Sequence, residues 1–210
     1  MSDLSERALE RLRQCVCATM SQKRFAHTLG TEQTVAEMAA LYCPEKTALL
    51  RAAALLHDVT KEYSESQTKE VLAREGVKLR PDEKASPQIW HAITAALEIP
   101  HLYPDLADAE LLSCVRWHTT GREGMTLTEQ LLYLADYIDM SRTFHSCVVL
   151  RRYFWGAEPE NMDAEARLCL LRQTLAFSFD LTMRDLLDDG ALIARETVDA
   201  RNELMLLLKE

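Results

Sequence analysis

Apolar residues recur at helical spacing along nearly the whole chain, and this periodicity restricts the fold more than any other feature. In the first segment they are Leu4, Ala8, Leu9, Leu12 and Cys15. Residues three or four apart lie on one face of an α-helix, so such a segment has one side to bury. The alternating β-branched runs typical of strands are absent from the sequence. We therefore expect an all-α fold.

Capping residues and prolines predict where the helices begin. We expect starts at or near Ser21, Pro44, Ser64, Pro87, Pro104 and Thr126. The helix that follows Pro44 is expected to end near residues 57–60, and breaks are expected at 77–87, 99–104 and 119–125. Two long helices should follow, at 163–189 and 195–210. These lengths predict a single domain over 1–210, with a core at about 20–145 and a C-terminal helical extension, about 146–210, packed across it.

Composition excludes some functions. The formal net charge of −9 argues against a nucleic-acid partner, which requires a basic face. A small anionic ligand stays compatible, because a local cluster of cations or metal ions can reverse the field in one cleft. The N-terminus lacks the apolar run of a signal peptide, and no apolar run is long enough to span a membrane. We expect a cytoplasmic protein without a membrane partner; whether it forms a homodimer is left open.

The six cysteines contain no C-x-x-C pair, so neither a zinc motif nor a redox motif is indicated. We expect reduced thiols, mostly buried.

Histidine and aspartate interrupt the apolar pattern in a specific order. The stretch "ALLHDVTKEYS" begins as an apolar helix and ends in His57 and Asp58. A single histidine beside an apolar run is usually a core residue, but an unpaired buried carboxylate is costly and needs a partner. The same type of position recurs at His27, His91, His118 and Asp136. Four imidazoles and two carboxylates suit two borderline metal ions, namely Fe, Mn, Co or Zn.

Longer motifs surround these residues. They are "RFAHTLG", "LLHDVTKEYS", "WHAITAAL", "RWHTTGREGMTLTEQLLYLADYIDMSR" and "IARETVDARNELM". Together they resemble the bacterial YqeK-like HD-domain proteins, which are symmetrical bis(5′-nucleosyl)-tetraphosphatases that split diadenosine tetraphosphate into two ADP. The resemblance covers about residues 20–205. It implies a hydrolase acting on acid anhydrides, with a helical HD-domain bundle and a nucleotide-binding site.

The resemblance also implies roles for individual residues. The ligands of two divalent or mixed-valence metal ions, with iron expected, would be His27, His57, Asp58, His91, His118 and Asp136. Asp58 would bridge the ions, with His27, His57 and Asp136 on one side and His91 and His118 on the other. Substrate contacts would come from Arg24, Lys61, His91, His118, Thr119, Arg142 and Thr197. Asp58 and Lys61 would take part directly in catalysis, and a hydroxide bridging the metals would attack an inner phosphorus.

The chain departs from the family pattern at three places. Ala92 stands where the family usually has Gly, and Asp139, Met140 and Ser141 stand where it has "EP" and a variable residue. Ala194 and Arg195 replace the His and Pro of "IHPxT". None of these changes removes a predicted ligand, but the substrate preference is left open. The alternatives are another nucleotide substrate, a monophosphate or a different polyphosphate, and a non-catalytic nucleotide-binding module.

Several neighbouring residues are expected to play structural parts. Asp139 lies one helical turn after Asp136 and should be a surface acid or a support for the ligands, not a ligand itself. We expect His101 in a surface loop and His145 outside the metal site. Trp90 and Trp117 should pack behind the predicted imidazoles.

Overall fold

The computed structural model describes residues 4–209. Within this range the regular secondary structure consists of helices and contains no strand, which confirms the all-α prediction. The α-helices are α1 (Glu6–Cys17), α2 (Gln22–Tyr42), α3 (Thr47–Leu56), α4 (Glu65–Arg74), α5 (Pro81–Lys84), α6 (Trp90–Leu102), α7 (Ala109–Trp117), α8 (Leu127–Ile138), α9 (His145–Trp155), α10 (Ala164–Asp188) and α11 (Arg195–Leu207). Short 3-10 helices, η1 (Pro44–Lys46), η2 (Pro87–Ile89), η3 (Pro104–Leu106) and η4 (Pro159–Asn161), join some of them. Within these described residues no helix is long and apolar enough to cross a membrane.

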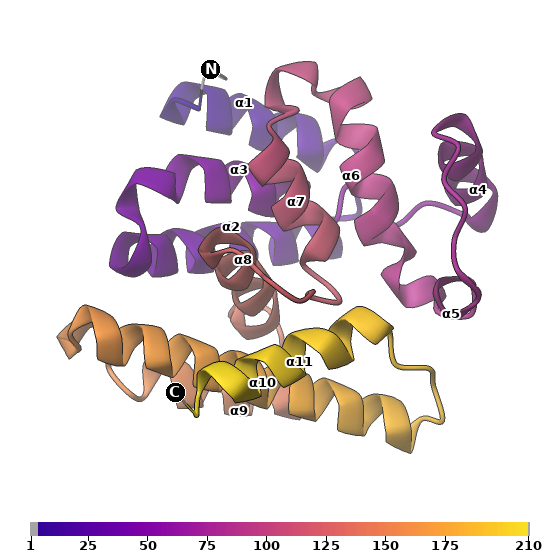
Figure 1. Cartoon of the computed structure of the whole chain (residues 1–210). Coiled ribbons are helices and arrows are strands. Elements are labelled where there is room, and N and C mark those ends of the chain that lie inside the picture. Colours follow the sequence, from indigo (N-terminus) through magenta and orange to yellow (C-terminus); the bar gives the residue numbers. More distant parts are fainter. Residues whose placement is uncertain (1–3, 210) are drawn as a thin grey trace.

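The helices form two groups, with α8 between them (Figure 1). The first contains α1, α2, α3, α6 and α7, and α4 and α5 lie at its side beyond α6. The second is a layer of α9, α10 and α11, drawn in orange and yellow. The Tyr42 hydroxyl donates to the Arg167 carbonyl at 2.9 Å, which ties α2 to α10. The C-terminal helices therefore pack across the earlier bundle, as the sequence predicts.

The apolar part of α3 anchors the centre of the bundle. Leu50, Leu55 and Leu56 are fully buried, as are the three consecutive alanines 52–54 between them. Each leucine side chain removed from water contributes about 1.5–3 kcal/mol. The small alanines let α2 and other neighbouring helices approach α3. The last turn of this helix is thus held firmly where the polar residues 57 and 58 begin.

The helix starts predicted at Ser64 and Thr126 are confirmed, and each carries a capping box. The Ser64 side chain accepts from the Gln67 backbone N–H, and the Gln67 side chain accepts from the Ser64 N–H, at the start of α4. Thr126 and Glu129 make the same reciprocal pair at the start of α8. Each pair satisfies two backbone N–H groups that a helix start would otherwise leave unpaired.

Three predicted boundaries are wrong. The helix α6 continues through Pro100 to Leu102, so His101 lies on a helix and not in a loop. Pro100 falls within the last turn, where the lost N–H bond interrupts little of the helix. Pro104 begins only the short η3. The helix α7 starts at Ala109, and the side chain of the preceding Asp108 accepts hydrogen bonds from backbone N–H groups of its first turn. The predicted loop 77–87 contains α5.

A buried carboxylate joins the first three long helices. Glu32 on α2 is 4% exposed, and its oxygens lie 2.6 Å from Arg13 of α1 and 3.0 Å from Arg51 of α3. Two guanidinium groups thereby compensate a charge that water cannot reach. Removing one partner of such a buried pair leaves the other charge uncompensated.

We predict that Glu32→Gln lowers the free energy of unfolding by about 2 kcal/mol, because both arginines lose their anionic partner. Urea denaturation measures this change. Glu37→Gln on the same helix is the matched control, since Glu37 is exposed, and should change stability by less than about 0.5 kcal/mol. Equal stability of the two variants would show that the network contributes nothing.

Candidate metal centre

The six predicted ligands come from five helices and converge on one buried place. His27 lies on α2, His91 on α6 and Asp136 on α8, while His57 and His118 directly follow α3 and α7. Asp58 follows His57 in the turn after α3. None of the six is more than 8% exposed. Residues up to 109 positions apart thus meet because their helices pack on α3.

Asp58 lies between two sets of imidazoles. Its Oδ2 atom is 3.4 Å from His57 Nε2 and 3.8 Å from His27 Nε2. Its Oδ1 atom is 3.3 Å from His91 Nε2 and 3.8 Å from His118 Nε2. The two oxygens of one carboxylate therefore face different sides, which is the arrangement a bridging carboxylate requires.

Two groups of donor atoms are close enough to hold a metal ion. One is His27, His57 and Asp136, and the other is His57, Asp58 and His118. His91 adds to the second side, because its Nε2 lies 3.1 Å from His118 Nε2. The first group matches the predicted first site. The second group also contains His57, so this residue belongs to both groups.

The donor atoms fit a metal that binds nitrogen and oxygen. His57 and His118 place Nδ1 at 2.6 and 2.7 Å from the Ala54 and Val115 carbonyls, so each carries its proton on Nδ1 and turns Nε2 to the centre. The buried Nε2 atoms of His27 and His57 make no hydrogen bond, although Asp136 Oδ1 lies 2.9 Å and 3.6 Å from them. Such unpartnered buried nitrogens are rare, and metal ligation would satisfy them. No cysteine belongs to either group, which argues against a structural zinc site.

The electrostatics of the centre keep the carboxylates ionised. Burial alone would raise the pKa of Asp58, but His57, His91 and Lys61 hold that pKa well below its usual range. Burial lowers the pKa of His118 to about 4, and His57 adds to that effect, so the His118 ring is neutral at pH 7. Burial would lower the pKa of His57, but Asp58 and Asp136 raise it to about 10. Because a neutral imidazole and an ionised carboxylate are the forms that bind metal, metal binding would release the proton of His57.

Three cationic side chains surround the same space. Arg24 lies 2.6 Å from Asp58, Arg142 lies 2.5 Å from Asp136, and Lys61 Nζ lies 3.1 Å from His91 Nδ1. Burial lowers the pKa of Lys61, and both arginines add to the lowering through repulsion, which places the three charges near one another. The protein carries a net charge of −9 but places three cations here. They balance the buried carboxylates, so bound metal ions would make the space attractive to an anionic substrate.

The predicted threonines occupy different places. The Thr119 hydroxyl lies 3.1 Å from His91 Nε2 and 3.0 Å from His118 Nε2, so it borders the centre. Thr197 is 4% exposed, and its hydroxyl donates to the Thr120 carbonyl at 3.0 Å. It thereby ties α11 to the loop after His118, and its contact with substrate stays a prediction.

Asp139 is not a surface acid. It is fully buried, and its Oδ2 lies 3.2 Å from His27 Nδ1. Of the two predicted alternatives, its position beside the His27 ring fits a support for the ligands. His145 opens α9 and belongs to neither ligand group. Trp90 and Trp117 are half-buried; Trp90 donates to the Glu83 carbonyl, and Arg116 stacks on Trp117.

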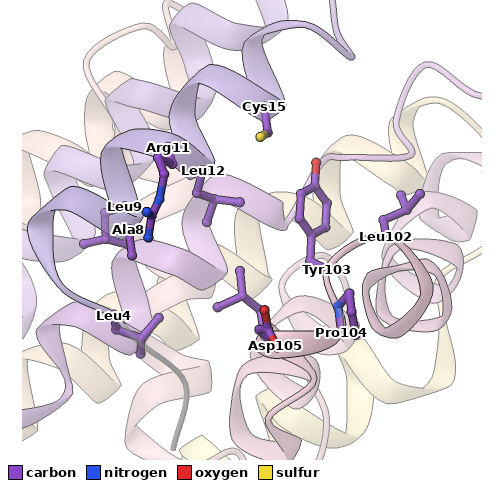
Figure 2. Close-up of a pocket in the computed structure, with 11 residues that line it drawn as sticks. Leu4, Ala8, Leu9, Arg11, Leu12, Cys15, Leu102, Tyr103, Pro104 and Asp105 are labelled. Carbon is purple, nitrogen blue, oxygen red and sulfur yellow. The ribbon is translucent and has the colours of Figure 1, made fainter.

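Two cavities differ in their relation to the centre. One, of about 380 Å³, is lined by Lys61 and His91 together with Tyr63, Gln88 and Trp90, and thus opens beside the ligands. Another, of about 800 Å³, lies between α1 and the segment after α6 (Figure 2). Its lining includes Leu12 and Tyr103 but none of the predicted ligands or cations. The first cavity is therefore the one that chemistry at the centre can use.

Residues 24–141 match the family model of the HD domain. This range contains all six predicted ligands.

Three curated proteins with the same name are similar to the chain. Each is a symmetrical bis(5′-nucleosyl)-tetraphosphatase. The protein of Bacillus subtilis (strain 168) is 32% identical over 130 residues, which cover 62% of this chain and 68% of that protein. The protein of Halalkalibacterium halodurans is 31% identical with the same coverage. That of Staphylococcus aureus (strain NCTC 8325 / PS 47) is 30% identical over 64% of this chain and 68% of its own length.

A solved structure shares the fold. It is a predicted HD superfamily hydrolase involved in NAD metabolism from Clostridium acetobutylicum. It superposes with a TM-score of 0.78 at 27% sequence identity, and the match covers 94% of this chain and 97% of that one. The likeness extends over the C-terminal helices as well as the HD-domain range.

We predict that Asp58→Ala lowers affinity for Mn²⁺ by at least about 100-fold, because Asp58 belongs to one donor group and its Oδ2 faces the other. Titration with a competing chelator dye measures this, with circular dichroism as the check on folding. The control is His145→Ala, which removes an imidazole outside the cluster. This variant should bind Mn²⁺ with the affinity of the unsubstituted protein. Unchanged affinity in a folded Asp58→Ala variant would rule Asp58 out as a ligand.

Proposed function

Because the chain belongs to the HD-domain family and, within it, to the symmetrical bis(5′-nucleosyl)-tetraphosphatases, we propose that this hydrolase cleaves diadenosine tetraphosphate into two ADP. The observation that carries the proposal is the position of Asp58. One buried carboxylate directs its two oxygens to two sets of imidazoles, and three cations lie beside them. A two-metal centre next to positive charge suits hydrolysis of a phosphate anhydride.

The metal ions would be held on either side of Asp58. On one side the ligands would be His27, His57 and Asp136, and on the other His91 and His118. When bound, the ions would supply Lewis acidity and lower the pKa of a water molecule enough for it to react near neutral pH. Iron is the metal we propose, since mixed imidazole and carboxylate ligation suits it.

The cations would bind and orient the polyphosphate. Arg24 and Arg142 each hold a carboxylate of the cluster and are partly exposed, with 28% and 27% of the side chain accessible. Guanidinium groups can bind phosphoryl oxygens with two parallel hydrogen bonds. Lys61 is more enclosed and lies against His91. It would stabilise the charge that develops on the departing ADP.

The cavity beside the centre would receive one nucleoside. Its volume of about 380 Å³ and its lining by Tyr63 and Trp90 suit an aromatic base. The Trp90 ring is fixed, because its Nε1 donates to the Glu83 carbonyl at 2.6 Å. Lys61 and His91 form the end of the cavity nearest the centre, so a polyphosphate could extend from the nucleoside to the ligands.

We propose that the whole chain works as one domain. The core of buried residues includes side chains from α1, α2 and α3, from α6, α7 and α8, and from α9, α10 and α11. The Thr197 hydroxyl bonds to the loop that follows His118, so the C-terminal helices support that loop. Separating the HD core, about 20–145, from the C-terminal extension, about 146–210, would expose Leu171 and Phe179, which are fully buried.

Purified protein supplied with Fe²⁺ or Mn²⁺ is predicted to convert diadenosine tetraphosphate to ADP as the sole nucleotide product. With the reaction run in H₂¹⁸O, one of every two ADP molecules should carry the label, since water attacks one inner phosphorus. Chromatography and mass spectrometry read both results. ATP plus AMP as products would show the wrong bond cleaved. Faster turnover of a nucleoside monophosphate than of diadenosine tetraphosphate would favour a different nucleotide as the substrate. No turnover of any nucleotide would favour a non-catalytic nucleotide-binding module.

Lys61→Gln is expected to lower kcat by about 100-fold with a smaller change in KM, because the charge of Lys61 is needed most as the leaving group becomes charged. Steady-state kinetics on diadenosine tetraphosphate test this. Lys69→Gln provides the comparison: Lys69 is an exposed lysine that pairs with Glu65 on α4, and its loss should leave both constants unchanged. A Lys61→Gln variant with full kcat would remove Lys61 from the reaction.

A further inference from the structure

His27 differs from His57 and His118 in how its ring can be oriented. His57 and His118 directly follow α3 and α7, so each reaches a carbonyl of the last turn that has no partner within the helix. His27 lies inside α2, where the neighbouring carbonyls are already bonded. Its Nδ1 therefore needs a side chain from elsewhere in the chain.

Asp139 supplies that side chain. Its Oδ2 lies 3.2 Å from His27 Nδ1 and has no hydrogen-bond partner. The second neighbour of Nδ1 is the Ser141 hydroxyl oxygen, at 3.4 Å. That hydroxyl donates its proton to Asp139 Oδ1, so it can only accept from the ring. Both neighbours of Nδ1 are thus acceptors, and so is Asp136 Oδ1, which lies 2.9 Å from Nε2. With a metal ion bound at Nε2, the ring proton would therefore be on Nδ1, facing Asp139.

The Asp139 carboxylate is itself held in place. Oδ1 accepts from the Ser141 backbone N–H at 2.8 Å, and Arg142 Nε lies 3.5 Å from Oδ2. The carboxylate rests against Gly30, one turn after His27 on α2. A Cβ atom at residue 30 would lie 2.7 Å from Oδ1. Glycine inside a helix costs about 0.5–1 kcal/mol relative to alanine, so a packing reason for it is needed, and the carboxylate provides one.

We propose that Asp139 is a positioning residue, which through His27 fixes the ring nitrogen presented to the metal, and that Gly30 leaves the space this carboxylate requires. The inference rests on the metal centre of the proposed function but not on its nucleotide substrate. Carboxylates that orient ligating histidines typically change metal affinity by 10–100-fold.

The test is a Mn²⁺ titration against a chelator dye, with the metal alone as the probe and folding checked by circular dichroism. Asp139→Ala should weaken the binding by about 10–100-fold. Asp139→Asn keeps an acceptor oxygen and should fall between it and the original protein. The control is Asp163→Ala, which removes an aspartate that likewise accepts from a backbone N–H, at the start of α10. It should leave Mn²⁺ affinity unchanged.

Gly30→Ala tests the mechanism without altering the carboxylate. It should weaken Mn²⁺ binding as Asp139→Ala does, although alanine favours the helix. In the Asp139→Ala background the same change should have no further effect, because no carboxylate remains to be displaced. Unchanged Mn²⁺ affinity in folded Asp139→Ala would overturn the proposal. So would a double variant whose loss of affinity equals the sum of the losses, in free energy, of the two single variants. If the original protein binds no Mn²⁺, the proposed centre itself fails.

Discussion

Two ionised carboxylates buried among four imidazoles impose the constraint on which the rest of the structure depends. Asp58 and Asp136 are at most 8% exposed, and a buried charge must be compensated within the protein. Histidines, arginines and Lys61 provide that compensation from several helices. Each helix must therefore reach the centre in a fixed orientation, which the packing around α3 allows.

The same constraint explains several details away from the centre. The helix α3 ends at Leu56, before His57, and this early end frees the Ala54 carbonyl for the His57 ring. The end of α7 does the same for His118. Thr197 bonds to the loop after His118, so a residue from the C-terminal extension supports it. Stability and ligand geometry thus depend on the same contacts.

The helical class, the helix caps and the clustering of the histidines and aspartates were predictable from the sequence, because each depends on local spacing or on residue type. The caps at Ser64 and Thr126 are examples. The continuation of α6 through Pro100 was not, because it depends on tertiary packing: Ile99 beside it is fully buried. Nor could the sequence place Asp139 against Gly30, since 109 residues separate them and only the packing of α8 on α2 brings them together.

The central proposal is that Asp58 would lie between two metal ions. Its most direct test is a crystal structure of the iron-loaded protein with anomalous data at the iron edge. The account predicts two anomalous peaks on opposite sides of the Asp58 carboxylate, one near His27, His57 and Asp136 and the other near His91 and His118. A single peak, or peaks away from Asp58, would contradict it.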